Sequence, residues 1–183
     1  MARLFFAIDL AQNTKDYLEK IQRQHHFLGH PISPHNFHIT LKFLGYLPQD
    51  RIEELIDAIT IPQIQPFQIQ LSSLAYYPKA QIGCIEPNEG SAQLLELRNR
   101  ILNNLATKKF PFKKDKNNYR PHVSLYRQCT PNTDLSTRYK FVAEVRSFSL
   151  MQSLFNDKGV YYHTIEEWPI YQPSLKEKIL GKS

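Results

Sequence analysis

Two five-residue segments of this 183-residue chain carry the same pattern of residue types. The first is Phe37-His38-Ile39-Thr40-Leu41 and the second is Pro121-His122-Val123-Ser124-Leu125. In each segment a histidine stands two residues before a hydroxyl side chain. The two histidines are 84 residues apart, close to half the chain length. Two copies of one lobe would give this spacing, although no further repeat between the halves is evident.

Both segments are expected to be β-strands, in which successive side chains point to opposite faces. In the first strand the apolar face then consists of Phe37, Ile39, Leu41 and Phe43, and the polar face of His38, Thr40 and Lys42. In the second strand Val123 and Leu125 point one way, and His122 and Ser124 point the other way. If the strands pack symmetrically, the two polar faces meet across one cleft.

Such a cleft would suit the cleavage of a phosphodiester without a metal. One imidazole would take a proton from water, and the other would give a proton to the leaving oxygen. Thr40, Ser124 and Lys42 would hold the phosphoryl oxygens, with Arg127 as a further candidate. Strand parity places Arg127 on the face away from His122, so its reach to the phosphate requires a twist or bulge at the strand end.

Other candidate residues have simpler explanations. The basic run Lys108–Lys116 contains Phe110 and Phe112, a combination that can hold RNA phosphates and stack bases, although charged runs are more often solvated loops. His26 and His30 are spaced as a metal pair would be, but no further ligands accompany them. We therefore expect no metal and no cofactor. Tyr46, Tyr76, Tyr77 and Trp168 could stack on a base, but packing is the expected role of each.

The elements that would position the two motifs alternate irregularly between strands and helices. Strands are expected at 4–8, 37–44, 67–71, 82–86, 121–127, 141–150 and 160–166. Helices are expected after Thr14, after Pro48 and after Ser91, and the last of these has a clear apolar stripe. Residues 25–34 are expected to form a loop, and residues 156–159 a hairpin turn. This order favours an α+β fold with antiparallel sheets.

Composition narrows the class of protein. Hydrophobic residues make up 42% and charged residues 22%, as in an ordinary globular chain. Lys and Arg exceed Asp and Glu by six, which permits a polyanionic partner such as RNA. Cys84 and Cys129 are 45 residues apart, which favours neither a disulfide framework nor a thiolate zinc site. The apolar run at Leu4–Ile8 is too short for a signal peptide or a membrane span, so a cytoplasmic location is expected.

The sequence resembles the two-histidine (2H) phosphoesterase superfamily, and within it the RNA 2′,3′-cyclic phosphodiesterases of the ThpR/LigT type. The segments that carry the resemblance are Arg3–Asp9, His38–Gly45, Arg120–Leu125 and the C-terminal Ser153, Gly159, Tyr162 and Trp168-Pro169. The resemblance extends over nearly the whole chain. Two positions depart from the family pattern: Ser124 stands where Thr is usual, and Tyr126 stands where a small residue is frequent.

The resemblance implies one bilobal domain over residues 1–183, with pseudo-twofold symmetry, antiparallel sheets around a central cleft, helices outside, and one HxTx-type motif in each lobe (38–41 and 122–125). It also implies that His38 is the proton donor to the leaving 3′-oxygen and that His122 is the base that activates water.

The expected function is hydrolysis of a terminal RNA 2′,3′-cyclic phosphate to a 2′-phosphate. The expected partner is RNA with such an end, with tRNA fragments as one candidate source; no membrane and no obligate protein partner are expected, and the protein should be a monomer. Two alternatives stay open. One is a non-catalytic RNA-binding module on the same fold, and the other is a 2′,5′ RNA ligase that runs the reaction in reverse.

Overall fold

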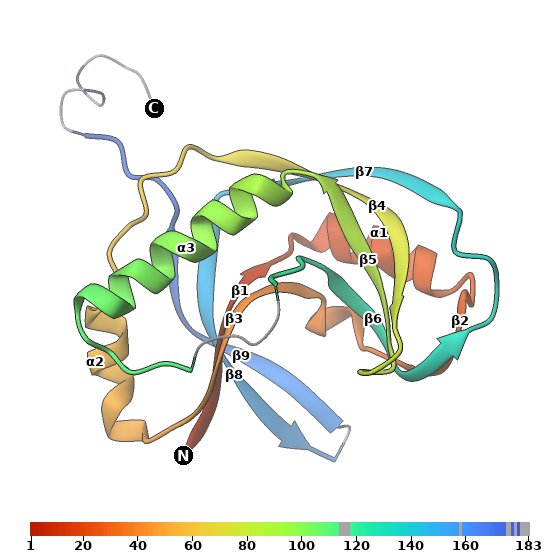
Figure 1. Ribbon diagram of the computed structural model, residues 1–183, viewed down its shortest axis with the longest axis horizontal. Helices are drawn as coiled ribbons and strands as arrows, with labels where there is room; N and C mark the ends of the chain where they lie inside the picture. The colour runs from red at the N-terminus through yellow and green to blue at the C-terminus, as the bar shows by residue number, and fades with distance from the viewer. Residues whose placement is uncertain (114–117, 158, 175–176, 178, 180–183) are drawn as a thin grey trace.

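The computed structural model describes residues 1–113, 118–157, 159–174, 177 and 179. Within these residues the fold is α+β, with one antiparallel sheet and three α-helices (Figure 1). The strands are β1 (Ala2–Asp9), β2 (Phe27–Pro31), β3 (His38–Leu47), β4 (Phe67–Tyr77), β5 (Ile82–Glu89), β6 (Val123–Pro131), β7 (Arg138–Val145), β8 (Ser147–Asn156) and β9 (Gly159–Pro169). The helices are α1 (Gln12–Gln22), α2 (Ile52–Asp57) and α3 (Ser91–Thr107). The expected fold class is confirmed.

The nine-stranded sheet consists of two halves, one of four strands and one of four strands with β2 added, which meet at the two histidine motifs. Its strand order is β7-β4-β5-β6-β3-β1-β8-β9, and β2 pairs with β6 off this path. Between β3 and β6 a single residue pair joins the halves, Ile39 with Val123. These are the middle residues of the two motifs. The antiparallel register therefore places His38 opposite Ser124 and Thr40 opposite His122.

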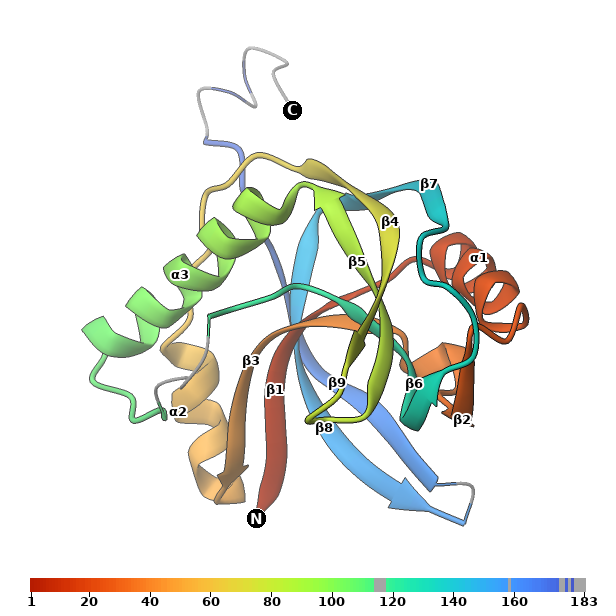
Figure 2. The same cartoon turned by 45° about the vertical axis from the view of Figure 1, so that its right-hand side comes forward.

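The helices pack outside the sheet, with α2 and α3 on one side of the molecule and α1 on the other (Figure 2). The stripe predicted for α3 is the face that it buries, because Leu94, Leu97, Ile101 and Leu105 are all inaccessible to solvent. Burying four such side chains contributes roughly 1.5–3 kcal/mol each. The stripe is a packing surface.

Several predicted boundaries are wrong, since β4 extends to Tyr77 and α1 begins at Gln12, and three differences change the arrangement of the elements. Residues 25–34 are not only a loop, because β2 lies within them and pairs with β6. Residues 141–150 form parts of two strands, which separate at Arg146 because β7 pairs with β4 in one half-sheet and β8 with β1 in the other. The helix after Pro48 begins with a 3₁₀ turn and its α-helical part ends at Asp57.

The predicted C-terminal hairpin is confirmed, since Asn156 pairs with Gly159 at the tip of β8 and β9. Lys158 of this turn, and Lys114–Lys116 of the basic run, lie outside the described residues. Cys84 and Cys129 are both buried free thiols. Among the described helices, none combines the length and the apolar character needed to cross a membrane.

Candidate active site

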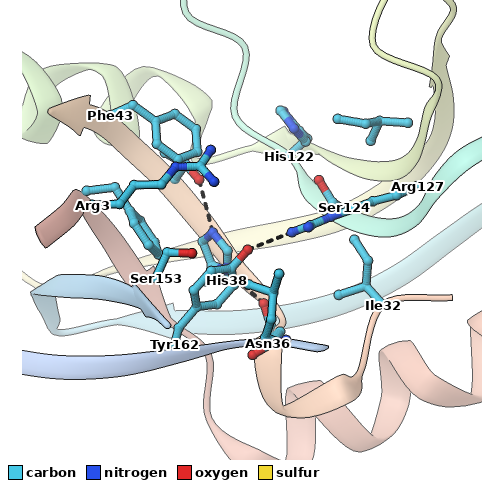
Figure 3. A pocket seen from close by; sticks show the side chains of 14 residues that line it. Arg3, Ile32, Asn36, His38, Phe43, His122, Ser124, Arg127, Ser153 and Tyr162 are labelled. Carbon is cyan, nitrogen blue, oxygen red and sulfur yellow. Dashed lines mark hydrogen bonds between the residues drawn. The ribbon is translucent and has the colours of Figure 1, made fainter. Parts of the chain in front are cut away.

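A cavity of about 240 Å³ lies where the two half-sheets meet (Figure 3). Both histidines and both hydroxyl residues of the motifs line it, as the sequence predicts. The full lining is Arg3, Phe5, Ile32, Asn36, His38, Thr40, Phe43, Ile82, His122, Ser124, Arg127, Ser153, Val160 and Tyr162.

His38 is held in one tautomer by its own backbone. Its Nδ1 lies 2.7 Å from the carbonyl oxygen of Asn36, and because a carbonyl only accepts, Nδ1 must carry the proton. In the neutral ring Nε2 is then the acceptor, and it receives the Thr40 hydroxyl at 3.0 Å. Phe5 and Tyr162 pack against the imidazole, with ring centres 5.1 and 4.9 Å away. These contacts fix the orientation of the ring.

His122 repeats this arrangement on the other half-sheet. Its Nδ1 donates to the carbonyl oxygen of Arg120 at 2.8 Å, which again lies two residues earlier in the chain. Tyr77 packs edge-on against the ring at 5.0 Å. Within the described ranges no protein group forms a hydrogen bond with Nε2 of His122. That nitrogen is therefore available as a base.

A β-bulge lies three residues after each histidine. It determines which side chains further along the strand face the cavity. On β3 Phe6 pairs with Lys42 and Ala7 with Thr40, so Leu41 is an extra residue. On β6 Gly83 pairs with Tyr126 and Cys84 with Ser124, so Leu125 is the extra residue there. Each extra residue shifts the alternation of the following side chains by one.

The first bulge makes the predicted position of Lys42 wrong. Lys42 turns away from the cavity and is buried, and its Nζ donates to the carbonyl oxygen of Lys113 at 2.6 Å. Phe43, expected in the core, is instead 53% exposed and lines the cavity. A phosphate contact from Lys42 is therefore not part of the function proposed below.

The second bulge brings Arg127 onto the cavity face, where simple parity excludes it. Its guanidinium donates to the hydroxyl of Tyr162 at 2.6 Å, a bond that spans the two half-sheets (Figure 3). Tyr126 is buried in turn, and its hydroxyl donates to the carbonyl oxygen of Gln22. The bulky Tyr126 thus packs into the core without displacing Arg127.

Both bulged residues have their carbonyl oxygens satisfied by helix side chains. Arg98 of α3 donates from Nε to the carbonyl oxygen of Leu41 at 3.1 Å. Gln22 of α1 donates from Nε2 to the carbonyl oxygen of Leu125 at 2.7 Å, and Ile32 adds its backbone N–H to the same oxygen. Since a bulge disrupts the local ladder, these bonds stabilise it.

Burial lowers the pKa of both imidazoles, because it disfavours the charged form. It lowers the pKa of His38 to about 4, although the bond to the Asn36 carbonyl and the charge of Asp9 partly oppose the shift. The pKa of His122 is also below its ordinary value of 6.5 for the same reason. At neutral pH both rings are therefore neutral when no ligand is present.

Known proteins share this architecture at 22–30% sequence identity. Residues 10–151 match the family model described as the 2′-5′ RNA ligase superfamily. The chain belongs to this superfamily. An RNA 2′,3′-cyclic phosphodiesterase of Methanocaldococcus jannaschii is 30% identical over 177 residues, covering 91% of this chain and 99% of the relative. A protein of the same name from Escherichia coli is 25% identical over 175 residues, covering 93% and 97% of the two chains.

Solved structures agree with the fold of this superfamily member. Escherichia coli LigT complexed with 3′-AMP superposes with a TM-score of 0.83 at 22% identity, covering 93% of this chain and 99% of that one. The protein TT0787 of Thermus thermophilus superposes with a TM-score of 0.73 at 23% identity, covering 92% and 98%. The resemblance recognised in the sequence is therefore confirmed for both family and fold.

Several lining residues of this 2′-5′ RNA ligase superfamily member were not predicted as site residues. They are Arg3, Asn36, Phe43, Ser153 and Tyr162. For Arg3 a signal existed in the sequence: it is the one charged residue within residues 2–8, whose other residues are all apolar. Ser153 and Tyr162 could not be found by parity alone, because nothing in their own strands shows which face meets the cavity.

The weaker candidates lie elsewhere. Both ring nitrogens of His26 form hydrogen bonds, with Thr133 on one side and with Gln24 and Tyr139 on the other. The described part of this superfamily member contains no group of three or more His, Cys, Asp or Glu side chains suited to a metal ion. Tyr77 contacts His122 from outside the cavity lining.

Proposed function

We propose that this protein is an RNA 2′,3′-cyclic phosphodiesterase that hydrolyses a terminal cyclic phosphate to a 2′-phosphate. The observation that carries the proposal is the pair of imidazoles in one cavity. In each of them Nδ1–H donates a hydrogen bond to a backbone carbonyl oxygen. Each ring therefore has Nε2 as the atom that can exchange a proton with a ligand. The activity named for the relatives supports the same reaction.

In this reaction His122 acts as the base and His38 as the acid. Nε2 of His122 takes a proton from water, and the water oxygen bonds to phosphorus. The bond from phosphorus to the 3′-oxygen breaks, and protonated His38 gives its Nε2 proton to that oxygen. One water is consumed, the phosphate stays on the 2′-oxygen, and solvent returns each imidazole to its starting state.

The substrate itself supplies the condition for His38 to act as an acid. In the protein alone, burial lowers the pKa of His38 to about 4. A bound cyclic phosphate carries a negative charge, and an opposite charge within about 4–6 Å favours the protonated imidazole. Binding therefore raises the pKa of His38 and creates the acid that the reaction needs.

The remaining polar groups stabilise the phosphate as charge develops. Thr40, Ser124 and Arg127 line the cavity beside the two imidazoles. Arg127 is held by Tyr162, and its planar guanidinium can donate two parallel hydrogen bonds to phosphate oxygens. Once His38 is protonated it no longer accepts the Thr40 hydroxyl, which is then free to donate to the phosphate.

The test is incubation with an oligonucleotide that ends in a 2′,3′-cyclic phosphate, with and without a chelator, followed by mapping of the phosphate. We expect a 2′-phosphate in both samples. A 3′-phosphate would contradict the assigned leaving group, and loss of activity with chelator would contradict metal-free catalysis. Binding without turnover would identify the protein as an RNA-binding module.

Formation of a 2′,5′ linkage is a second candidate, favoured by the name of the matching superfamily. With the imidazoles in the same proton states, His122 would take a proton from a 5′-hydroxyl in place of water, the 5′-oxygen would bond to phosphorus, and His38 would protonate the leaving 3′-oxygen. Formation of a chelator-independent, longer product from two oligonucleotides would detect it.

A further inference from the structure

Arg3 is a cation at the rim of the cavity with no acidic partner among the described residues. It lies on β1, is exposed and lines the cavity. Its cross-strand neighbours are Tyr46 on β3 and Ser153 on β8. Within the part of the chain that the structure describes, no hydrogen bond or ion pair engages its guanidinium. A cation placed this way can take an anion from solution without first breaking a contact.

Ser153 places an unsatisfied hydroxyl beside Arg3. The residue is only 8% exposed, and its Oγ is a buried polar atom with no hydrogen-bond partner among the described residues. Figure 3 shows this oxygen pointing into the cavity, on the side that also holds Arg3 and His38. Because burying an unpartnered hydroxyl is unfavourable, a ligand oxygen at this position would be stabilised.

The proposed reaction determines which part of the substrate lies on this side. The attacking water and the leaving 3′-oxygen lie on opposite sides of phosphorus in an in-line displacement. His122 activates the water, so the ribose lies on the side of His38. That side is the half-sheet that carries Arg3 and Ser153. This step rests on the proposed function.

The cavity is too small to hold more of the RNA than its terminal ribose and cyclic phosphate. At about 240 Å³ it is smaller than the roughly 300 Å³ at which ordinary ligand pockets begin, so it suits a cyclic phosphate with its ribose. The mouth beside Arg3 carries two exposed aromatic rings, Phe43 at 53% and Tyr46 at 68%. We therefore expect the 5′-oxygen of the terminal nucleotide to lie at the cavity mouth, next to Arg3.

We propose that Arg3 and Ser153 form a second anion subsite, which binds the phosphate on the 5′ side of the terminal nucleotide. The guanidinium of Arg3 donates to the phosphate oxygens, and the Ser153 hydroxyl donates to one of them or to the adjoining ribose oxygen. The enzyme accordingly prefers the end of an RNA chain to a nucleoside cyclic phosphate without a 5′-phosphate.

The experiment compares kcat/KM for three substrates: adenosine 2′,3′-cyclic phosphate, the same compound with a 5′-phosphate, and a dinucleotide ending in the cyclic phosphate. We expect the wild type to favour the second and third by about 10-fold or more, as a charge-assisted contact permits. Arg3→Met should remove most of this preference, because it should lower kcat/KM for the second and third substrates several-fold more than for the first. Arg3→Lys should retain part of it, and Ser153→Ala should reduce it a few-fold.

Arg23→Met is the matched control, because Arg23 lies at the end of α1 in an exposed pair with Glu19 and outside the cavity lining. It should keep the full preference. Equal wild-type kcat/KM for the first two substrates would overturn the subsite while leaving the proposed function intact. An equal loss on all three substrates in Arg3→Met would also overturn it, because Arg3 would then act on the reacting phosphate or on the fold.

Failure of the proposed function would look different, since the wild type would cleave none of the three substrates. In that case the subsite is tested by measuring the affinity for a dinucleotide that ends in a 2′-phosphate. Arg3→Met should weaken this binding and reduce the slope of log K against log salt by about one, whereas Arg23→Met should not. An unchanged slope would overturn the subsite.

Discussion

Leu41 and Leu125 are equivalent residues of the two half-sheets. Each is the last residue of its motif and the extra residue of a β-bulge, and each carbonyl oxygen accepts a hydrogen bond from a helix side chain. Two residues later the halves differ, because Phe43 lines the cavity on β3 and Arg127 lines it on β6. The backbone is thus nearly symmetric around the cavity, whereas the groups that it presents are not.

Gln22 should matter for turnover as well as for stability. Gln22→Met removes the hydrogen bonds to the carbonyl oxygens of Leu125 and Ile32, and loosens the bulge that turns Arg127 into the cavity. We expect kcat on a cyclic-phosphate oligonucleotide to fall about 10-fold at 25 °C, together with a destabilisation of about 1–3 kcal/mol. A urea titration measures the second effect. Unchanged kcat in the folded variant would show that Gln22 has only a structural role.

Replacing either histidine should abolish most of the activity and little of the binding. His38→Ala and His122→Ala should each lower kcat by roughly 10²–10⁴-fold, the usual contribution of an acid or a base. The double variant should lose far less than the product of the two losses, because both residues act in one step. His163→Ala, an exposed histidine of β9, is the control. Near wild-type kcat in a single variant would contradict the mechanism.

The pH profile of kcat/KM should be a bell with its maximum below pH 6.5. The productive free enzyme has His38 protonated and His122 neutral, and burial lowers the pKa of both, that of His38 to about 4. The rate therefore falls as pH drops below the lower pKa and as it rises above the higher one. The kcat profile should lie at higher pH, since bound phosphate raises both pKa values. A kcat/KM that rises to a plateau above pH 8 would exclude a protonated imidazole.

Two glycines with left-handed backbones should respond differently to alanine. Gly45 and Gly90 have φ values of 85° and 80°. A Cβ at Gly45 would meet no atom within 4 Å, whereas one at Gly90 would lie 2.5 Å from the carbonyl oxygen of Gln68. We expect Gly45→Ala to cost about 1–2 kcal/mol and Gly90→Ala a further 1–3 kcal/mol in urea denaturation. Equal costs would show that the Gln68 backbone moves aside freely. Gly90→Ala also serves as a destabilised control for Gln22→Met, with unchanged kcat.

Much of the site could be predicted from two short motifs, because alternation in a strand is a local property. It correctly placed His38 with Thr40 and His122 with Ser124. The same rule failed at Lys42 and at Phe43, since it assumes a regular strand and Leu41 adds a residue. Nothing in the sequence of β3 itself signals that bulge; the hydrogen bond that stabilises it comes from Arg98, more than fifty positions away.

The fold class could be predicted from the mixed order of strands and helices. The positions at which the chain passes from one half-sheet to the other could not. The apolar pattern of residues 141–150 continues through Arg146, although the chain moves there from one half-sheet to the other. Periodicity reports burial on one face and carries no information on which strand lies beside it. For the same reason β2, which has one buried residue, gave no signal.

The single backbone pair between Ile39 and Val123 has a consequence for how the protein fails under stress. Each histidine is held by contacts within its own half-sheet, whereas the two halves are joined by this one backbone pair of the β3–β6 ladder, by the Arg127–Tyr162 hydrogen bond and by packing in a shared core. A small shift of one half against the other breaks few backbone hydrogen bonds, and local openings of this kind cost less than global unfolding. Inactivation in urea should therefore precede the loss of ellipticity, and a tightly bound product analogue should bring the two transitions together.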